Sequence, residues 1–109
     1  MIGDTSPTAD IVAAGDNLYR LQTDGEIRRY DGHRWDVLWC DKQQKTLSIT
    51  ACGYQLYRRQ EGKVWRYAGT PISGWEVVDE SEATVDIIAG DWALYKRHND
   101  GSIWQMTLI

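Results

Sequence analysis

The sequence contains no phenylalanine, only two prolines and two cysteines, and no long apolar segment. A membrane-spanning helix needs about 20 consecutive apolar residues, so we expect no membrane insertion. The cysteines, Cys40 and Cys52, form no CxxC pair and have no histidine at a spacing suited to zinc. We therefore expect two reduced, partly buried thiols, no metal and no cofactor. The first ten residues, MIGDTSPTAD, lack a secretion signal, and together with the thiols this favours a cytoplasmic location.

The chain also lacks a block of charge of one sign. Its formal net charge is −4, and acidic residues stand among the arginines along its whole length. Domains that bind nucleic acid usually concentrate Lys and Arg on one face. The interspersed charges therefore predict solvated strand edges and no nucleic-acid partner.

In place of phenylalanine the chain has six tryptophans and six tyrosines among its 109 residues. Large aromatic side chains with a polar end suit half-buried sheet positions and interfaces better than a uniformly apolar interior. The length is that of one domain. These residues are therefore the main candidates for both the core and a binding surface.

Three similar segments recur along the chain. GDNLYRLQTDGEIRRYDG begins at residue 15, GYQLYRRQEGKVWRYAG at 53 and DWALYKRHNDGSIWQMT at 91. A step of 38 residues separates equivalent positions, among them Thr8, Thr46 and Thr84; Ile11, Ile49 and Ile87; and Tyr19, Tyr57 and Tyr95. Self-similarity at a fixed period of this length indicates stacked units that cannot bury their apolar faces alone.

Within each repeat the apolar residues alternate with a period of two, which predicts strands rather than helices. The second repeat shows four such runs, LSITA, QLYRRQ, KVWRY and GWEVV. The turns TDGE, QEGK and NDGS join the second and third runs, and their glycine is typical of tight hairpins. Each repeat is therefore predicted to be a four-stranded antiparallel meander, and the protein to be all-β.

Four-stranded units of about 40 residues with recurring aromatic and glycine positions are typical of β-propeller blades. The pattern A-x-G-x-x-L-Y, a turn glycine, I/V-W-x-Y-x-G and then G-W-x-x-x-D resembles the repeats of tectonin- and tachylectin-type propeller lectins. The second repeat matches best, with ACGYQLY and GKVWRYAGTPISGWEVVDE. The resemblance covers nearly the whole chain. It implies a β-propeller fold and carbohydrate binding.

We expect one domain over residues 1–109, with repeats at about 8–45, 46–83 and 84–109, the last completed by residues 1–7. Three blades cannot surround an axis, since propellers have about 4–8 blades. Two copies of the chain would close a six-bladed ring, and closed two-fold assemblies are the commonest homo-oligomers. Each copy would lend Met1–Gly3 as an outer strand to the third blade of the other copy.

Three alternatives to this assembly remain open at the level of the sequence. A ring of three copies would have nine blades, which exceeds the usual range. The chain could also be part of a longer propeller. A β-trefoil has three four-stranded repeats as well and closes as a monomer, although the chain lacks the QxW signature of that fold.

The sequence shows no enzyme signature. His33 and His98 stand in or beside loops without a second ligand at metal spacing. No serine lies in a G-x-S-x-G motif, and no glycine-rich phosphate loop follows a strand. An active site is asymmetric and is seldom repeated three times along a chain. We therefore expect no catalytic residues.

Repetition does suit multivalent binding, in which weak sites add through avidity. Glycans are the partner we expect, because an aromatic ring can stack on a pyranose while polar side chains bind its hydroxyl groups. The alternatives are a protein-interaction scaffold, in which the same aromatics would be anchors, and a structural or assembly-test propeller without a ligand.

Binding residues are expected on the loops of one rim or between the blades. The rim candidates are Asp16, Asn17, His33, Arg34, Tyr54 and Trp92. Arg58 and Lys96 occupy a repeated basic position and are the candidates between blades. By contrast, Trp65, Trp104 and the three repeated tyrosines are predicted to belong to the core.

Overall fold

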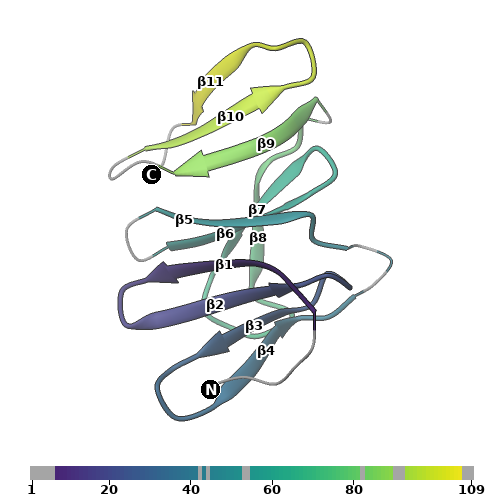
Figure 1. Cartoon of the computed structure of the whole chain (residues 1–109). Coiled ribbons are helices and arrows are strands. Elements are labelled where there is room, and N and C mark those ends of the chain that lie inside the picture. The colour runs from purple at the N-terminus through teal and green to yellow at the C-terminus, as the bar shows by residue number, and fades with distance from the viewer. Residues whose placement is uncertain are drawn as a thin grey trace.

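The computed structural model describes residues 7–41, 43, 45–52, 55–81, 83–89 and 93–106, and every structural statement below concerns these residues. They form strands and turns and no helix, which confirms the all-β prediction. Three antiparallel sheets are stacked in chain order, with the first and third sheets at opposite ends (Figure 1).

Each sheet takes all of its strands from one repeat. The first sheet consists of β1 (Thr8–Ala14), β2 (Asn17–Gln22), β3 (Ile27–Tyr30) and β4 (Trp35–Trp39). The second consists of β5 (Ser48–Cys52), β6 (Gln55–Gln60), β7 (Lys63–Tyr67) and β8 (Trp75–Asp79). The third consists of β9 (Thr84–Ala89), β10 (Leu94–His98) and β11 (Ile103–Met106). The predicted meander is confirmed in the first two repeats, and three of its strands are present in the third.

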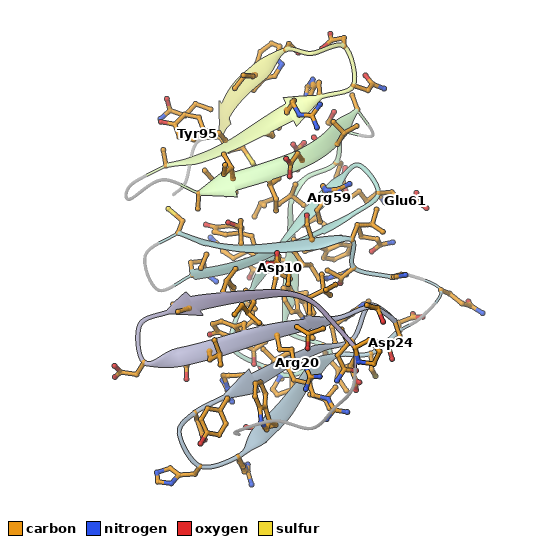
Figure 2. The ribbon with its side chains drawn as sticks, in the orientation of Figure 1. Asp10, Arg20, Asp24, Arg59, Glu61 and Tyr95 are labelled. Atoms are coloured by element: carbon orange, nitrogen blue, oxygen red, sulfur yellow. The ribbon has the colours of Figure 1, made fainter. Side chains whose placement is uncertain are left out.

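The turns between the second and third strands of the sheets follow the predicted Asp-Gly and Glu-Gly positions. In the first sheet the Gln22 N–H donates to the Glu26 carbonyl at 2.8 Å, and Gly25 has a φ of 90°. The second sheet uses a shorter turn, because Gln60 pairs directly with Lys63. Glu61 is held there at a φ of 51°. Figure 2 shows Asp24 and Glu61 at the same end of their sheets.

Glu61 therefore carries backbone strain that a different residue would relieve. A non-glycine residue in the left-handed region costs roughly 1–2 kcal/mol, and asparagine tolerates that region better than glutamate does. We expect Glu61→Asn to raise the free energy of unfolding by about 0.5–1 kcal/mol, measured by urea denaturation. Glu61→Val, which is β-branched, is the matched control and should destabilise the fold. A loss of stability in Glu61→Asn would show that the turn is not strained.

Side chains alternate between the two faces of each sheet and form two apolar clusters. The first cluster is buried between the first and second sheets and contains Tyr19, Leu21, Ile27, Leu38, Ile49, Leu56, Tyr67 and Trp75. The second is buried between the second and third sheets and contains Tyr57, Val64, Ile87, Leu94 and Met106. The middle sheet is thus covered on both faces.

The first strands of the three repeats lie next to one another, since β1 contacts β5 and β5 contacts β9. Hydrogen-bonded strand pairing in the described residues stays inside each repeat. A β-trefoil closes a barrel between strands of different repeats, so the trefoil alternative does not describe this structure.

The strand exchange by Met1–Gly3 lies outside the described residues and stays a prediction. The first described residue, Pro7, lies beside the first sheet, where its carbonyl accepts a hydrogen bond from the Thr23 N–H at 3.2 Å. Of the two cysteines, Cys52 is half-buried as expected, whereas Cys40 is exposed.

The expected core aromatics are buried in the first two repeats but not in the third. Tyr19 and Tyr57 are buried and Trp65 packs against the first cluster. Tyr95 and Trp104 are exposed, so the core prediction was wrong for these two in the single chain. The physical reason is that β11 is the last strand described in its sheet, and the described residues form no sheet that covers the outer face of the third.

Candidate functional site

Two turns of the first sheet share one end of that sheet, as predicted for the rim. Asp16 is exposed in the β1–β2 turn, where Gly15 has a φ of 61°. Asn17 begins β2, is half-buried and pairs with Ala14. His33 and Arg34 are exposed in the β3–β4 turn. Because neighbouring strands lie about 4.8 Å apart, the two turns are separated by about 10 Å.

The β3–β4 turn is held in shape by Asp31. Its carboxylate accepts hydrogen bonds from the backbone N–H groups of His33 at 2.9 Å and Arg34 at 3.0 Å. These bonds, that from Arg34 first, hold the pKa of Asp31 below its usual value. The Arg34 guanidinium in turn lies 3.1 Å from the Asp36 carboxylate. Arg34 is therefore engaged in an ion pair, and His33 is exposed in the same turn. Tyr54 and Trp92, the other rim candidates, lie outside the described residues.

Arg58 is fully buried between the first and second sheets. Its guanidinium carbon lies 3.9 Å from the ring centre of Trp39, 5.0 Å from that of Trp65 and 5.3 Å from that of Trp75. The guanidinium also donates to Thr46 Oγ1 at 3.2 Å and to Gln60 Oε1 at 3.3 Å. Burial lowers the pKa of Arg58 to about 10, against the effect of the Asp41 charge. A ligand could not reach this side chain without separating the two sheets.

Lys96, the equivalent residue of the third sheet, lies instead at the wall of an open groove. Its ammonium is 2.6 Å from the Asp79 carboxylate of β8, and both side chains are largely buried. The groove has a volume of about 330 Å³ and runs between β8 and β11. Its lining residues are Val78, Asp79, Lys96, Trp104, Gln105 and Met106.

Trp104 gives the groove an aromatic wall. The side chain is 54% exposed, although its indole N–H donates to Ser102 Oγ at 2.9 Å. Its ring also lies against the ring of His98, with the centres 5.6 Å apart. These two contacts fix the orientation of the indole while leaving part of it open to solvent.

The first and second sheets pack together in one junction, and the second and third sheets in another. The groove lies in the second junction, and the corresponding space in the first junction is filled. The strand register makes Trp39 and Asp79 equivalent. Ile27 pairs with Trp39 in the first sheet, and its counterpart Val64 pairs with Asp79 in the second. In the first junction the space beside β4 holds Trp75, which is buried and donates its indole N–H to the Leu38 carbonyl at 3.0 Å. The third sheet has no described strand that carries a counterpart of Trp75. The groove beside Val78 and Trp104 therefore lies at the position that corresponds to the Trp75 side chain of the first junction.

The two junctions thus use different chemistry at the same positions. An arginine lies on a tryptophan in the first junction, and a lysine pairs with an aspartate in the second. Only Lys96 among the groove residues was a candidate from the sequence.

The chain matches no protein-family model, and no curated protein matches it either. Among the described residues there is no cluster of three or more His, Cys, Asp or Glu side chains suited to a metal ion. The described part of the chain also contains no helix of the length and apolarity needed to cross a membrane.

Proposed function

We propose that this protein is a non-enzymatic carbohydrate-binding β-propeller module, and that the groove between β8 and β11 binds one sugar ring. The observation that carries the proposal is the combination of a fixed, exposed indole with a lysine and an aspartate in one groove. Ligand sites are concave and mostly apolar, with a small number of well-placed polar groups.

The chemistry of the groove matches a pyranose. The open part of the Trp104 indole offers an apolar surface to the C–H groups of a sugar ring. Lys96 has three N–H donors and the Asp79 carboxylate about four acceptor positions, so their mutual ion pair leaves both able to bind hydroxyl groups. Hydrogen bonds to charged groups are roughly twice as strong as those between neutral groups.

We further propose that two copies of the chain form a closed six-bladed ring. Ring closure would place two equivalent grooves in one particle, and linked sites gain up to 10²–10⁴ in avidity over a single site. The three stacked sheets with adjacent first strands support this arrangement. The resemblance of the repeats to those of propeller lectins points to the same function.

We expect Trp104→Ala to raise the dissociation constant for a glycan at least about tenfold per site, because the stacking surface is removed. A tenfold change corresponds to about 1.4 kcal/mol of binding free energy. The measurement is isothermal titration with the strongest ligand found on a glycan array. Since Trp104 is exposed, the thermal unfolding temperature of the variant should differ little from that of the wild type. The matched controls on the rim are His33→Ala and Asp16→Ala, which should bind as the wild type does.

Two outcomes would contradict this assignment. If the rim variants lose binding and Trp104→Ala keeps it, the ligand binds at the turns of the first sheet. If the wild type binds no glycan on the array, the carbohydrate proposal fails, and a protein-interaction scaffold or a propeller without a ligand becomes the better reading of the repeats.

A further inference from the structure

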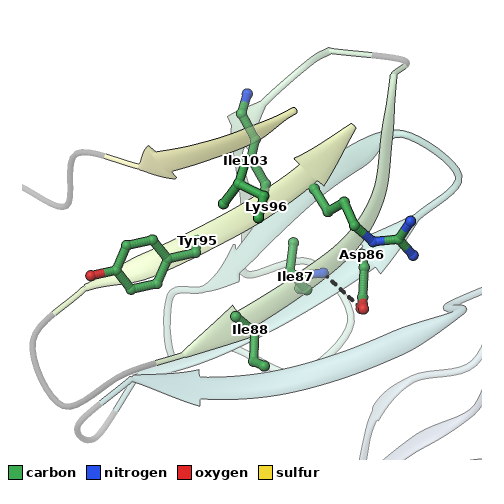
Figure 3. Close-up of a pocket in the computed structure, with 7 residues that line it drawn as sticks. Asp86, Ile87, Ile88, Tyr95, Lys96 and Ile103 are labelled. Carbon is green, nitrogen blue, oxygen red and sulfur yellow. Dashed lines mark hydrogen bonds between the residues drawn. The ribbon is translucent and has the colours of Figure 1, made fainter. Parts of the chain in front are cut away.

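The outward face of the third sheet carries an uncovered apolar surface. This surface, the terminal face, consists of Ile88 on β9, Tyr95 on β10 and Ile103 on β11, with Asp86 and Arg97 beside them. Figure 3 shows Ile88, Tyr95 and Ile103 on the three neighbouring strands of this sheet, with Asp86 on the same strand as Ile88. They surround a hollow of about 150 Å³. The sugar groove described above lies on the opposite face of the same sheet, and Lys96 of β10 is the residue that lines both hollows.

The repeat positions of Tyr95 and Ile103 are buried in the other two sheets, and those of Ile88, namely Val12 and Thr50, are half-buried there. Ile103 is 74% exposed, whereas its counterparts Ile27 and Val64 are both 0% exposed. Tyr95 is exposed, whereas Tyr19 and Tyr57 are buried. In the first and second sheets these positions pack against the next sheet along the chain. The terminal face therefore has the composition of a junction surface.

The outward face of the first sheet shows the converse pattern. Ile11 on β1 is 61% exposed, whereas its counterparts Ile49 and Ile87 are 4% and 6% exposed. Leu18 on β2 is half-buried, whereas Leu56 and Leu94 are buried. We call this surface, formed by Ile11 and Leu18 with Tyr30 and Trp35, the initial face. In the second and third sheets the matching residues pack against the preceding sheet.

Each junction inside the chain therefore joins one face of each kind. A tyrosine of the second strand and an Ile or Val of the third strand come from the earlier sheet, and an Ile of the first strand and a Leu of the second come from the later one. Among the described residues, the stack ends in one face of each kind that no other sheet covers. The two exposed surfaces thus match, position by position, the two sides of the internal junctions.

We propose that the occupant of the terminal face is the initial face of a second copy of this chain. When the terminal face of one copy packs on the initial face of the other, one initial face and one terminal face of the pair remain. These two faces form a second, equivalent junction, and the two junctions together close the ring. The alternative, two terminal faces packed on each other, would place Tyr95 and Ile103 against themselves, and neither internal junction is built in that way. The inference specifies the ring closure proposed above and is independent of the sugar groove.

The test uses the full chain and two single variants, Ile11→Asp and Ile103→Asp, studied by sedimentation equilibrium. We expect the wild type to have the mass of two chains. Each variant alone should have the mass of one chain, because both junctions of its ring would contain one buried aspartate. The dissociation constant should rise by at least about 100-fold, since an apolar contact is lost and a charge is buried at each of two junctions.

A mixture of the two variants gives the sharpest result. One junction of the mixed pair then joins the unchanged terminal face of the Ile11→Asp chain to the unchanged initial face of the Ile103→Asp chain. We therefore expect the mixture to form dimers that neither variant forms alone. Leu47→Asp is the matched control, because Leu47 is an exposed aliphatic residue of the middle repeat, and it should keep the mass of two chains. Circular dichroism of each variant establishes that its sheets are intact.

Several results would overturn the inference. A wild-type mass of one chain at every concentration would show that the faces do not associate, whether or not a glycan binds. A mass of more than two chains would exclude the two-copy ring. Dimers of Ile11→Asp alone would show that the terminal faces pair with each other, and a mixture that remains monomeric would show that the two faces are not complementary.

Discussion

Arg58→Ala is expected to lower the free energy of unfolding by about 3–5 kcal/mol, the usual cost of truncating a large buried side chain to alanine. Arg58 fills the space among three tryptophans at the junction of the first two sheets. A cation on aromatic rings contributes about 2 kcal/mol or more when it is shielded from water. The variant would lose these contacts and leave a cavity. Urea denaturation monitored by tryptophan fluorescence measures the change.

Arg58→Met separates the role of volume from that of charge. Methionine fills a similar space without a buried charge, and replacing buried ionic groups by apolar ones is often neutral or stabilising. No carboxylate is hydrogen-bonded to the Arg58 guanidinium in the described structure; its partners there are Thr46 and Gln60. We therefore expect Arg58→Met to remain within about 1 kcal/mol of the wild type. If the Met and Ala variants are equally unstable, the junction depends on the cation itself.

Tyr57→Ala is expected to cost about 3–5 kcal/mol, by extension from other buried aromatic residues. Tyr57 is buried on the other face of the middle sheet, in the cluster with Val64, Ile87 and Leu94. Thermal and urea unfolding of the variant measure the loss. A change of less than about 1 kcal/mol would mean that the junction between the second and third sheets is not formed as described.

The conservative control Tyr57→Phe keeps the ring and should lower the free energy of unfolding by less than about 1 kcal/mol.

Tyr57→Phe also tests the pH dependence of stability. Burial raises the pKa of Tyr57 above its ordinary value of 10.0, and Cys52 acts in the same direction. As the pH rises, the phenol loses its proton in the unfolded chain before it does so in the folded chain. The contribution of Tyr57 to the free energy of unfolding is therefore fully present below about pH 10 and decreases as the pH rises toward the folded pKa. Tyr57→Phe should show a smaller fall than the wild type over this range.

The strands were predictable because each depends on local sequence. The Asp-Gly turns at residues 24 and 100 and the alternation in β6 and β7 are signals within a few residues of one another. The 38-residue step also predicted the number of units and their meander order. These features needed no knowledge of how the sheets pack.

The candidate site was predicted less well because it depends on contacts between repeats. Arg58 and Lys96 have the same position in the repeat, yet one is enclosed by indoles and the other lines a groove. The difference arises from Trp39 and Asp79, which lie in the preceding sheet and whose equivalence became evident only from the strand register. Likewise, the exposure of Trp104 reflects what lies beside its sheet rather than its own motif.

The confinement of strand pairing to single repeats has a consequence for how a chain of this kind can grow. A duplicated stretch of 38 residues would add a complete sheet without breaking any hydrogen bond of the existing ones. The new sheet would bring one initial and one terminal face, so the lengthened chain would still end in the same two surfaces. In evolution the number of repeats per chain could therefore increase while the number of chains per ring decreases, or the reverse, with the same junction between neighbouring sheets.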